Sequence, residues 1–242
     1  MNRHLVTRTL QITVLLGVVA LGTRPAAAQY APVDFSQQTF SAMNLSSSYI
    51  LSQNALRLST DLADRPKAKA RASTVTTGRS NAADKLAAAY PENVRGETRR
   101  SLAGLLTAYA EVEKSLGMPR GDAAASVAFL VVASFEAYRD TDVEPRHYNR
   151  LVTQLRGVLA NDPAFARASR AERRDLYEQT AILGMLVAVT RANLVEKPDP
   201  ATARRLREAA RGYLVELSLD PDAIQIDERG ITATSSAGAA AP

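Results

Sequence analysis

The chain has 242 residues, with 30 Lys or Arg against 25 Asp or Glu, two His and no Cys. The lack of cysteine excludes disulfides, thiolate metal sites and a lipid anchor on a cysteine. Apolar residues make up 46% of the chain, yet Trp is absent and Phe occurs five times. This composition favours closely packed helices with small side chains.

Residues 1–28 have the organisation of a signal peptide. A basic start precedes an apolar run over 12–21, and three alanines that end at Ala28 precede Gln29. Ten apolar residues span only about 15 Å as a helix, roughly half of the hydrocarbon core of a bilayer. We therefore expect cleavage between Ala28 and Gln29, export to the periplasm or the medium, and no transmembrane helix afterwards. An uncleaved N-terminal anchor is the alternative.

The positive charge is concentrated near the start of the mature chain. Cleavage would remove three arginines and leave 27 basic and 25 acidic side chains. Residues 57–100 hold ten basic and five acidic residues, whereas 101–242 hold 17 and 19. Such a tract attracts anionic lipid, nucleic acid or an acidic partner, although its few aromatic residues argue against nucleic acid. A solvated leader without a partner is the alternative.

Three further segments follow the signal peptide. Residues 29–80, rich in Ser, Thr and Gln and then basic, are expected to be a leader with low order, in which the apolar patch 49–58 forms at most a short docking helix. Residues 81–231 are predicted to fold as one helical domain. Residues 232–242, composed mainly of Ala, Ser and Thr, are expected to be a disordered tail.

Apolar positions that recur every three or four residues predict the helices of this domain. The predicted ranges are 82–89, 97–116, 123–139, 145–160, 172–195 and 201–217. The helices 123–139 and 172–195 are apolar nearly all round, so we expect both to be central. The segment 223–231 is an extended stretch or a closing loop. The predicted fold class is all-α, a single compact bundle of five or six helices.

Local signals mark the ends of several helices. Ser169 and Glu172 have the spacing of a capping box, in which each side chain binds the backbone N–H of the other residue. Asp122 is expected to cap the helix that follows it. This cap also explains the sequence Arg120-Gly121-Asp122, which otherwise spells a cell-adhesion tripeptide.

Several kinds of catalytic and metal-binding site are excluded because the residues that they require are absent. After cleavage His147 is the one remaining histidine, which excludes sites with several histidines such as the H-E-x-x-H helix. The chain has no G-x-S-x-G, S-x-x-K, P-loop or G-x-G-x-x-G motif. His147 is expected to be exposed or half-packed. We expect no metal and no cofactor.

Two acidic groups begin like calcium loops. Asp140, Asp142 and Glu144 have the right spacing, but Pro145 stands where an EF-hand needs glycine. The group formed by Asp220, Asp222 and Asp227 fails at the same position, which is occupied by Gln225. Solvated turns are the expected structures for both groups.

Glu136 and Glu178 are the candidate catalytic residues, because each lies on a predicted central helix. A pair of carboxyl groups can act as general acid and base, as in glycosidases. Arg150, Gln154 and Arg191 are nearby in the pattern. The alternative is therefore an ion-pair network with arginine, since buried charges are retained when they are paired.

The segment from about Asn81 to Ile231 resembles a family of exported bacterial all-helical proteins known only as a domain of unknown function. The resemblance rests on the order of four groups of residues. They are Phe135-Glu136-Ala137-Tyr138, Leu151-Val152-Thr153-Gln154-Leu155, Asp162-Pro163-Ala164-Phe165 before Ser169-Arg170-Ala171-Glu172-Arg173-Arg174, and Leu219-Asp220-Pro221-Asp222 before Arg229-Gly230-Ile231. The resemblance implies the fold and export, and no mechanism.

The favoured interpretation is an exported, non-enzymatic binding or structural protein of the cell envelope with an unknown protein or envelope partner. One alternative is an acid/base hydrolase that uses Glu136 and Glu178. The other is a protein that binds an anionic membrane or polymer surface through the basic leader.

Overall fold

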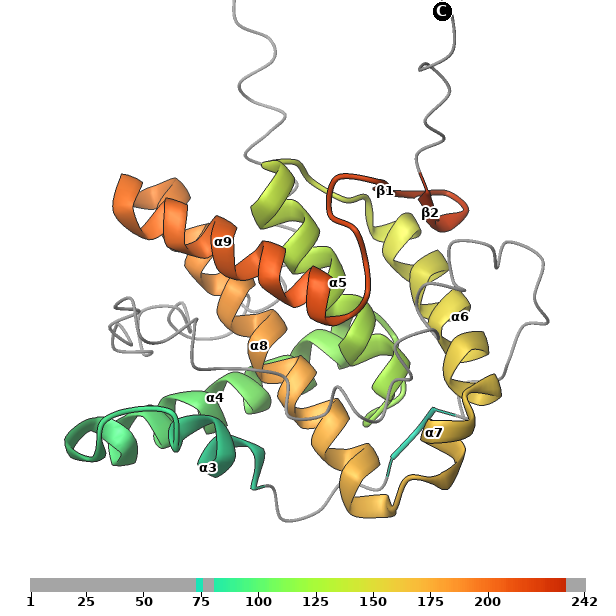
Figure 1. Cartoon of the computed structure of the whole chain (residues 1–242), viewed down its shortest axis with the longest axis horizontal. Coiled ribbons are helices and arrows are strands. Elements are labelled where there is room, and N and C mark those ends of the chain that lie inside the picture. Colours follow the sequence, from blue (N-terminus) through green and yellow to red (C-terminus); the bar gives the residue numbers. More distant parts are fainter. Residues whose placement is uncertain (1–72, 76–80, 234–242) are drawn as a thin grey trace, which may run out of the picture.

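The computed structural model describes residues 73–75 and 81–233, which form seven helices and one β-hairpin (Figure 1). The predicted signal peptide, the patch 49–58 and the tail from 234 onward lie outside these residues. The helices are α3 (Ala82–Ala87), α4 (Glu92–Ser115), α5 (Ala123–Arg139), α6 (Pro145–Asn161), α7 (Pro163–Arg167), α8 (Arg170–Glu196) and α9 (Pro200–Glu216). The strands are β1 (Ile224–Asp227) and β2 (Gly230–Ala233). The prediction of a compact all-α fold is confirmed.

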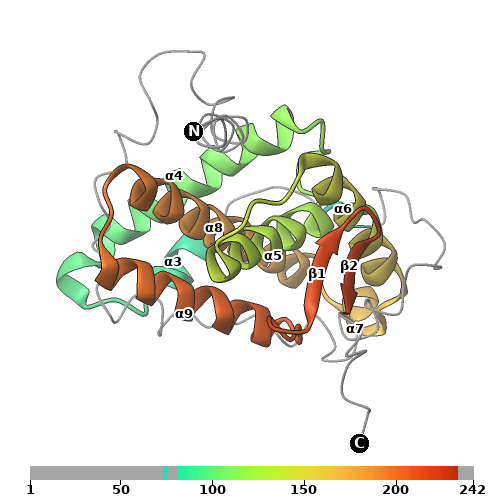
Figure 2. The same cartoon turned by 90° about the horizontal axis from the view of Figure 1, so that it is seen from above.

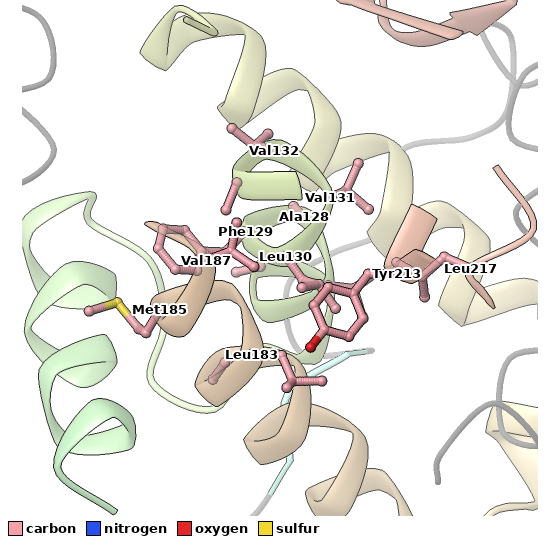
Figure 3. Packing of buried hydrophobic residues seen from close by; sticks show 14 of the residues in the cluster. Ala128, Phe129, Leu130, Val131, Val132, Leu183, Met185, Val187, Tyr213 and Leu217 are labelled. Atoms are coloured by element: carbon pink, nitrogen blue, oxygen red, sulfur yellow. The ribbon is translucent and has the colours of Figure 1, made fainter. Parts of the chain in front are cut away.

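Helix α5 lies in the middle of the other helices (Figure 2). Every residue from Ala123 to Phe135 is buried, which agrees with the lack of a polar face in its sequence. It packs against α8, α9 and α6. The second helix predicted to be central, α8, is buried without interruption from Leu176 to Val187. Side chains of α5, α8 and α9 meet in the core, where Leu130, Leu183 and Tyr213 come together (Figure 3).

Helices α5 and α8 run in the same direction and approach closely at Gly184. The Thr180 hydroxyl binds that of Ser126 at 2.8 Å near the start of the contact, whereas Arg191 reaches Glu136 at its end. A Cβ atom on Gly184 would lie 2.7 Å from Cδ1 of Phe129 and 3.1 Å from the backbone nitrogen of Leu130. Only glycine therefore fits at this crossing without a shift of α5.

The caps predicted for α5 and α8 are present at the first turns of these helices. The Asp122 side chain accepts the N–H of Ala124 at 3.1 Å, and α5 begins and ends at the predicted residues. In the capping box of α8, Ser169 N–H donates to Glu172 at 2.6 Å and Glu172 N–H donates to the Ser169 hydroxyl at 3.2 Å. Each cap satisfies backbone donors that a helix start leaves without partners.

Two parts of the helical structure differ from the prediction. Helix α4 begins at Glu92, five residues before the predicted start, because its first turns are exposed and carry no apolar pattern. The short helix α7 was not predicted. Asp162 caps it by accepting the N–H of Ala164 at 2.8 Å, and Pro163 occupies its first position.

The C-terminal segment is an antiparallel hairpin in which Ile226 lies opposite Ile231. Thr232 and Ala233 belong to β2, so the folded part extends two residues beyond the predicted end at Ile231. The pairing was not predicted because this segment consists mainly of Ala, Ser and Thr without an alternating pattern. Among the described helices, none combines the length and the hydropathy that a membrane span requires.

Candidate functional site

The first candidate, Glu136, holds the connection between α5 and α6. Its Oε1 atom accepts the N–H of Val143 at 2.8 Å, and its Oε2 atom lies 3.7 Å from the guanidinium of Arg191. Arg191 also pairs with Asp142 at 2.9 Å and donates to the carbonyl of Thr141 at 3.2 Å. Burial raises the pKa of Glu136 to about 7, against the lowering effect of the Val143 N–H and Arg191. The predicted ion-pair network with Arg191 is thus present.

The second candidate, Glu178, does not join this network. It lies near the start of the buried part of α8 and is 4% exposed. Thr180, two residues further on, contacts Ser126, and Glu136 follows Ser126 by ten residues on α5. Ten helical residues extend about 15 Å. Since α5 and α8 run in the same direction, the two carboxyl groups lie toward opposite ends of the helix pair.

Gln154 has a structural partner in the C-terminal hairpin. Its amide accepts the N–H of Ile231 at 2.8 Å and donates to the carbonyl of Ile231 at 3.1 Å, which continues the hairpin's hydrogen bonding as a third strand would. A Cβ atom on Gly230, which has a φ of +100°, would lie 2.3 Å from the Gln154 amide oxygen. The side chain therefore fixes the hairpin on α6. Arg150, another arginine nearby in the sequence pattern, is half-buried on the same helix.

The other sequence candidates have local roles. His147 is half-packed in the first turn of α6, as predicted. Asp222 accepts a hydrogen bond from Tyr138 at 2.7 Å, and Asp227 pairs with Arg229 at 2.9 Å. Within residues 73–75 and 81–233, no group of three or more His, Asp or Glu side chains is arranged to hold a metal ion.

A buried polar cluster that the sequence prediction missed surrounds Glu113, in the last turn of α4. This residue is 2% exposed, and its Oε2 atom accepts the Tyr177 hydroxyl of α8 at 2.7 Å and the N–H of Gly121 at 3.5 Å. Its Oε1 atom is buried without a hydrogen-bond partner. Burial raises the pKa of Glu113 to about 7, and the charge of Asp122 contributes to the increase.

A sequence signal for Glu113 did exist. Tyr109 and Leu116 belong to the apolar face of this helix, and Glu113 follows the first by four positions and precedes the second by three. This spacing places all three on one face. An acid within an apolar stripe is the pattern of a buried titratable group.

Asp122 is the centre of the same cluster and is fully buried. Its Oδ2 atom accepts both Nε and Nη2 of Arg156 of α6, at 2.8 and 2.6 Å. Its Oδ1 atom accepts the Ala124 N–H of the cap and the hydroxyl of Ser73. The paired Arg156 compensates a charge that would otherwise be costly to bury.

The leader prediction requires a correction at Ser73–Val75, which belong to the folded core. Ser73 is fully buried and Val75 is 7% exposed. The Val75 N–H donates to Gly121 at 2.8 Å, and the Ala123 N–H donates to Ser73 at 3.0 Å. Together with the bond from Ser73 to Asp122, these contacts form a short antiparallel bridge, called the clasp below. This short segment is held in place by Gly121, Asp122 and Ala123, which are distant in the sequence, so its own residues do not predict its position.

The fold and this site define a class: an all-α bundle with a buried central helix and an N-terminal extension that is attached to the cap of that helix. The chain belongs to DUF6683, a family of unknown function, whose family model matches residues 7–234. The predicted membership in a family of unknown function is confirmed. The match also includes the region before Asn81, which the sequence resemblance did not cover. No curated protein and no solved structure matches the chain.

Proposed function

We propose that this protein is an exported, non-enzymatic binding protein of the cell envelope. It binds an anionic membrane surface through a basic tract. The tract is residues 57–80, with six Lys or Arg against two Asp. The observation that carries the proposal is the clasp. It attaches the tract to the helical domain directly after four basic residues, Arg65, Lys67, Lys69 and Arg71.

The spacing of these four residues suits a charged surface. They occupy alternate positions, so an extended chain presents all four charges on one side. Each Lys or Arg close to an anionic membrane contributes about 1 kcal/mol. Four contribute roughly 4 kcal/mol, or about a thousandfold in affinity. Dissolved salt screens this attraction, so binding through the tract is sensitive to ionic strength.

The roles of the acidic side chains support a function without catalysis. Glu136 binds Val143 and Arg191, and Asp122 binds a helix cap and Arg156. The rival hydrolase needs Glu136 and Glu178 within about 5 to 10 Å of each other. Their places toward opposite ends of the α5–α8 pair weigh against such a reaction.

Vesicle sedimentation tests the proposal with the mature chain, residues 29–242. Vesicles of phosphatidylglycerol and phosphatidylcholine should bind the protein at low salt, and vesicles of phosphatidylcholine alone should not. Replacing Arg65, Lys67, Lys69 and Arg71 with Ser should abolish binding. Substitution is preferable to deletion of the whole tract, because deletion also removes Ser73 and Val75 from the core.

A matched control removes the same charge from the helical domain. The exposed residues Arg100, Arg170, Arg204 and Arg211 are suitable for replacement with Ser. This control should retain most of the binding. Equal losses in both variants would show that net charge alone attracts the vesicles and would overturn the proposal, as would an absence of binding by the native protein.

Export has a separate test. The full chain is produced in a Gram-negative host, and the protein in the periplasmic fraction is sequenced from its N-terminus. The signal peptide predicts a mature protein that starts at Gln29. Retention of the intact chain in the cytoplasm would contradict this part of the proposal.

A further inference from the structure

The loop Gly121–Ala123 lies between Glu113 and the clasp and contacts both. On one side, the Gly121 N–H points to the carboxyl group of Glu113 at 3.5 Å. On the other side, the Gly121 carbonyl accepts the Val75 N–H at 2.8 Å, and the Ala123 N–H donates to Ser73 at 3.0 Å. A movement of this loop toward Glu113 therefore acts directly on the clasp.

Glu113 and Asp122 are two buried acids, and only Asp122 has an ion pair among the described residues. Asp122 is paired with Arg156, whose Nη2 atom lies 2.6 Å from the carboxylate. Glu113 accepts hydrogen bonds from Tyr177 and Gly121 and has no ion pair of its own among the described residues. An ionised Glu113 therefore adds a second negative charge to a site in which Asp122 and Arg156 already balance.

We infer that the clasp is controlled by a proton: protonated Glu113 keeps Ser73–Val75 on the core, and ionisation of Glu113 releases this segment. A charged carboxylate draws its hydrogen-bond donors to about 2.7–2.9 Å, and the Gly121 N–H lies well outside that range at 3.5 Å. Ionisation pulls Gly121 away from Val75. Release of the segment then admits water to the loop and lowers the cost of the charge.

The electrostatic surroundings of Glu113 also favour a closed clasp at low pH and its release as the pH rises. Burial raises its pKa to about 7, and the charge of Asp122 adds to the increase, whereas bonds from Tyr177 and the loop backbone lower it. A carboxyl group with a raised pKa in the closed state binds its proton more tightly there than in an open, hydrated state. The closed clasp is therefore favoured below pH 7 and loses stability as the pH rises toward 7.

Several titratable and charged groups surround Glu113 and the tyrosines next to it. They are Tyr109 of α4, Arg120 and Asp122 before the start of α5, Tyr148 and Arg156 of α6, and Tyr177 of α8. The pKa values of the three tyrosines are raised by burial, so their hydroxyls stay neutral across the range concerned. Glu113, whose pKa is raised to about 7, changes its charge near neutral pH.

Amide hydrogen exchange at Val75 and Ala123 tests the inference, because these two N–H groups close the clasp. Exchange rates are corrected for the intrinsic effect of pH and expressed as protection factors. In the native protein, protection should fall as the pH rises from 5 to 8, by at most roughly a hundredfold if the open state restores an ordinary pKa. Glu113→Gln should make protection independent of pH in this range.

Glu136→Gln is the matched control. It replaces a half-buried glutamate whose pKa is also raised to about 7, in the last turns of α5 and away from the clasp. It should leave the pH dependence at Val75 and Ala123 unchanged. Constant protection in the native protein, or an unchanged pH dependence in Glu113→Gln, would overturn the inference.

If Glu113→Gln does not fold, a second variant, Tyr177→Phe, tests the inference. The Tyr177 hydroxyl stabilises the ionised form of Glu113, so Tyr177→Phe should move the midpoint of the protection change to higher pH. A midpoint that stays in place or moves to lower pH would contradict the inference. Neither test involves membranes, so the result is independent of what the basic tract binds.

Discussion

The hydroxyl of Ser73 donates a hydrogen bond to Oδ1 of Asp122, 49 residues further along the chain. The same oxygen accepts the Ala124 N–H at the start of α5, and the second carboxylate oxygen binds Arg156. One fully buried side chain thus connects the N-terminal extension, the central helix and α6. Its removal should affect all three.

Asp122→Ala should lower the free energy of unfolding by about 3 to 5 kcal/mol, because it removes a cap and leaves Arg156 without its buried partner. Asp199→Ala is the matched control. Asp199 also caps a helix, through the N–H groups of Ala201 and Thr202, but in an exposed position. It should cost only about 1 kcal/mol. Urea unfolding measures both variants. If the free energy of unfolding falls equally in Asp122→Ala and Asp199→Ala, Asp122 acts only as a helix cap.

Gly184→Ala should destabilise the protein by roughly 1 to 3 kcal/mol, because the added methyl group meets Phe129 and the backbone of Leu130. Gly212→Ala provides the contrast within α9, since a Cβ atom there meets nothing within 4 Å. Alanine favours a helix over glycine by about 0.5 to 1 kcal/mol. Thermal unfolding should therefore shift in opposite directions for the two variants.

Gln154→Ala should loosen the C-terminal hairpin and leave the helices intact. It removes two hydrogen bonds to Ile231, each of which contributes about 1 kcal/mol. Hydrogen exchange at the Ile231 amide should accelerate by one to two orders of magnitude. Thr153→Ala is the control, since that hydroxyl binds Asn149 within α6. An unchanged rate at Ile231 in Gln154→Ala would show that apolar packing holds the hairpin.

The free energy of unfolding should decrease as the pH rises from about 5 to 7. Glu113 and Glu136 have folded-state pKa values raised from 4.5 to about 7, so between these values the folded protein binds more protons than the unfolded chain. Each group contributes a slope of up to about 1.4 kcal/mol per pH unit. The contribution is complete below pH 4.5 and lost above 7.

Urea unfolding at several pH values measures this slope. Glu136→Gln and Glu113→Gln should each remove about half of it, and the double variant should remove nearly all. Asp199 and Asp227 have lowered pKa values, so their effect belongs to more acidic solutions. A native protein whose stability is constant from pH 5 to 7 would contradict the raised pKa values of both glutamates.

The helices of this protein are determined by nearby residues. Asp122 starts α5 and the pair Ser169 and Glu172 starts α8, because a cap needs only the side chain and the N–H groups two or three residues away. The unbroken apolar sequence of α5 also predicted its central place. The first turns of α4 and the short α7 were missed, since neither combines a cap with an apolar pattern.

The sites depend on contacts between distant residues. Glu136 pairs with Arg191 and lies far from Glu178 because α5 and α8 run in the same direction, which periodicity within one helix does not determine. Glu113 meets Tyr177 across 64 positions, and Ser73 meets Asp122 across 49. The sequence by itself determined where the helices begin and which faces are apolar. Only the tertiary structure decided which polar groups share a buried site, because burial and pairing arise when the helices pack.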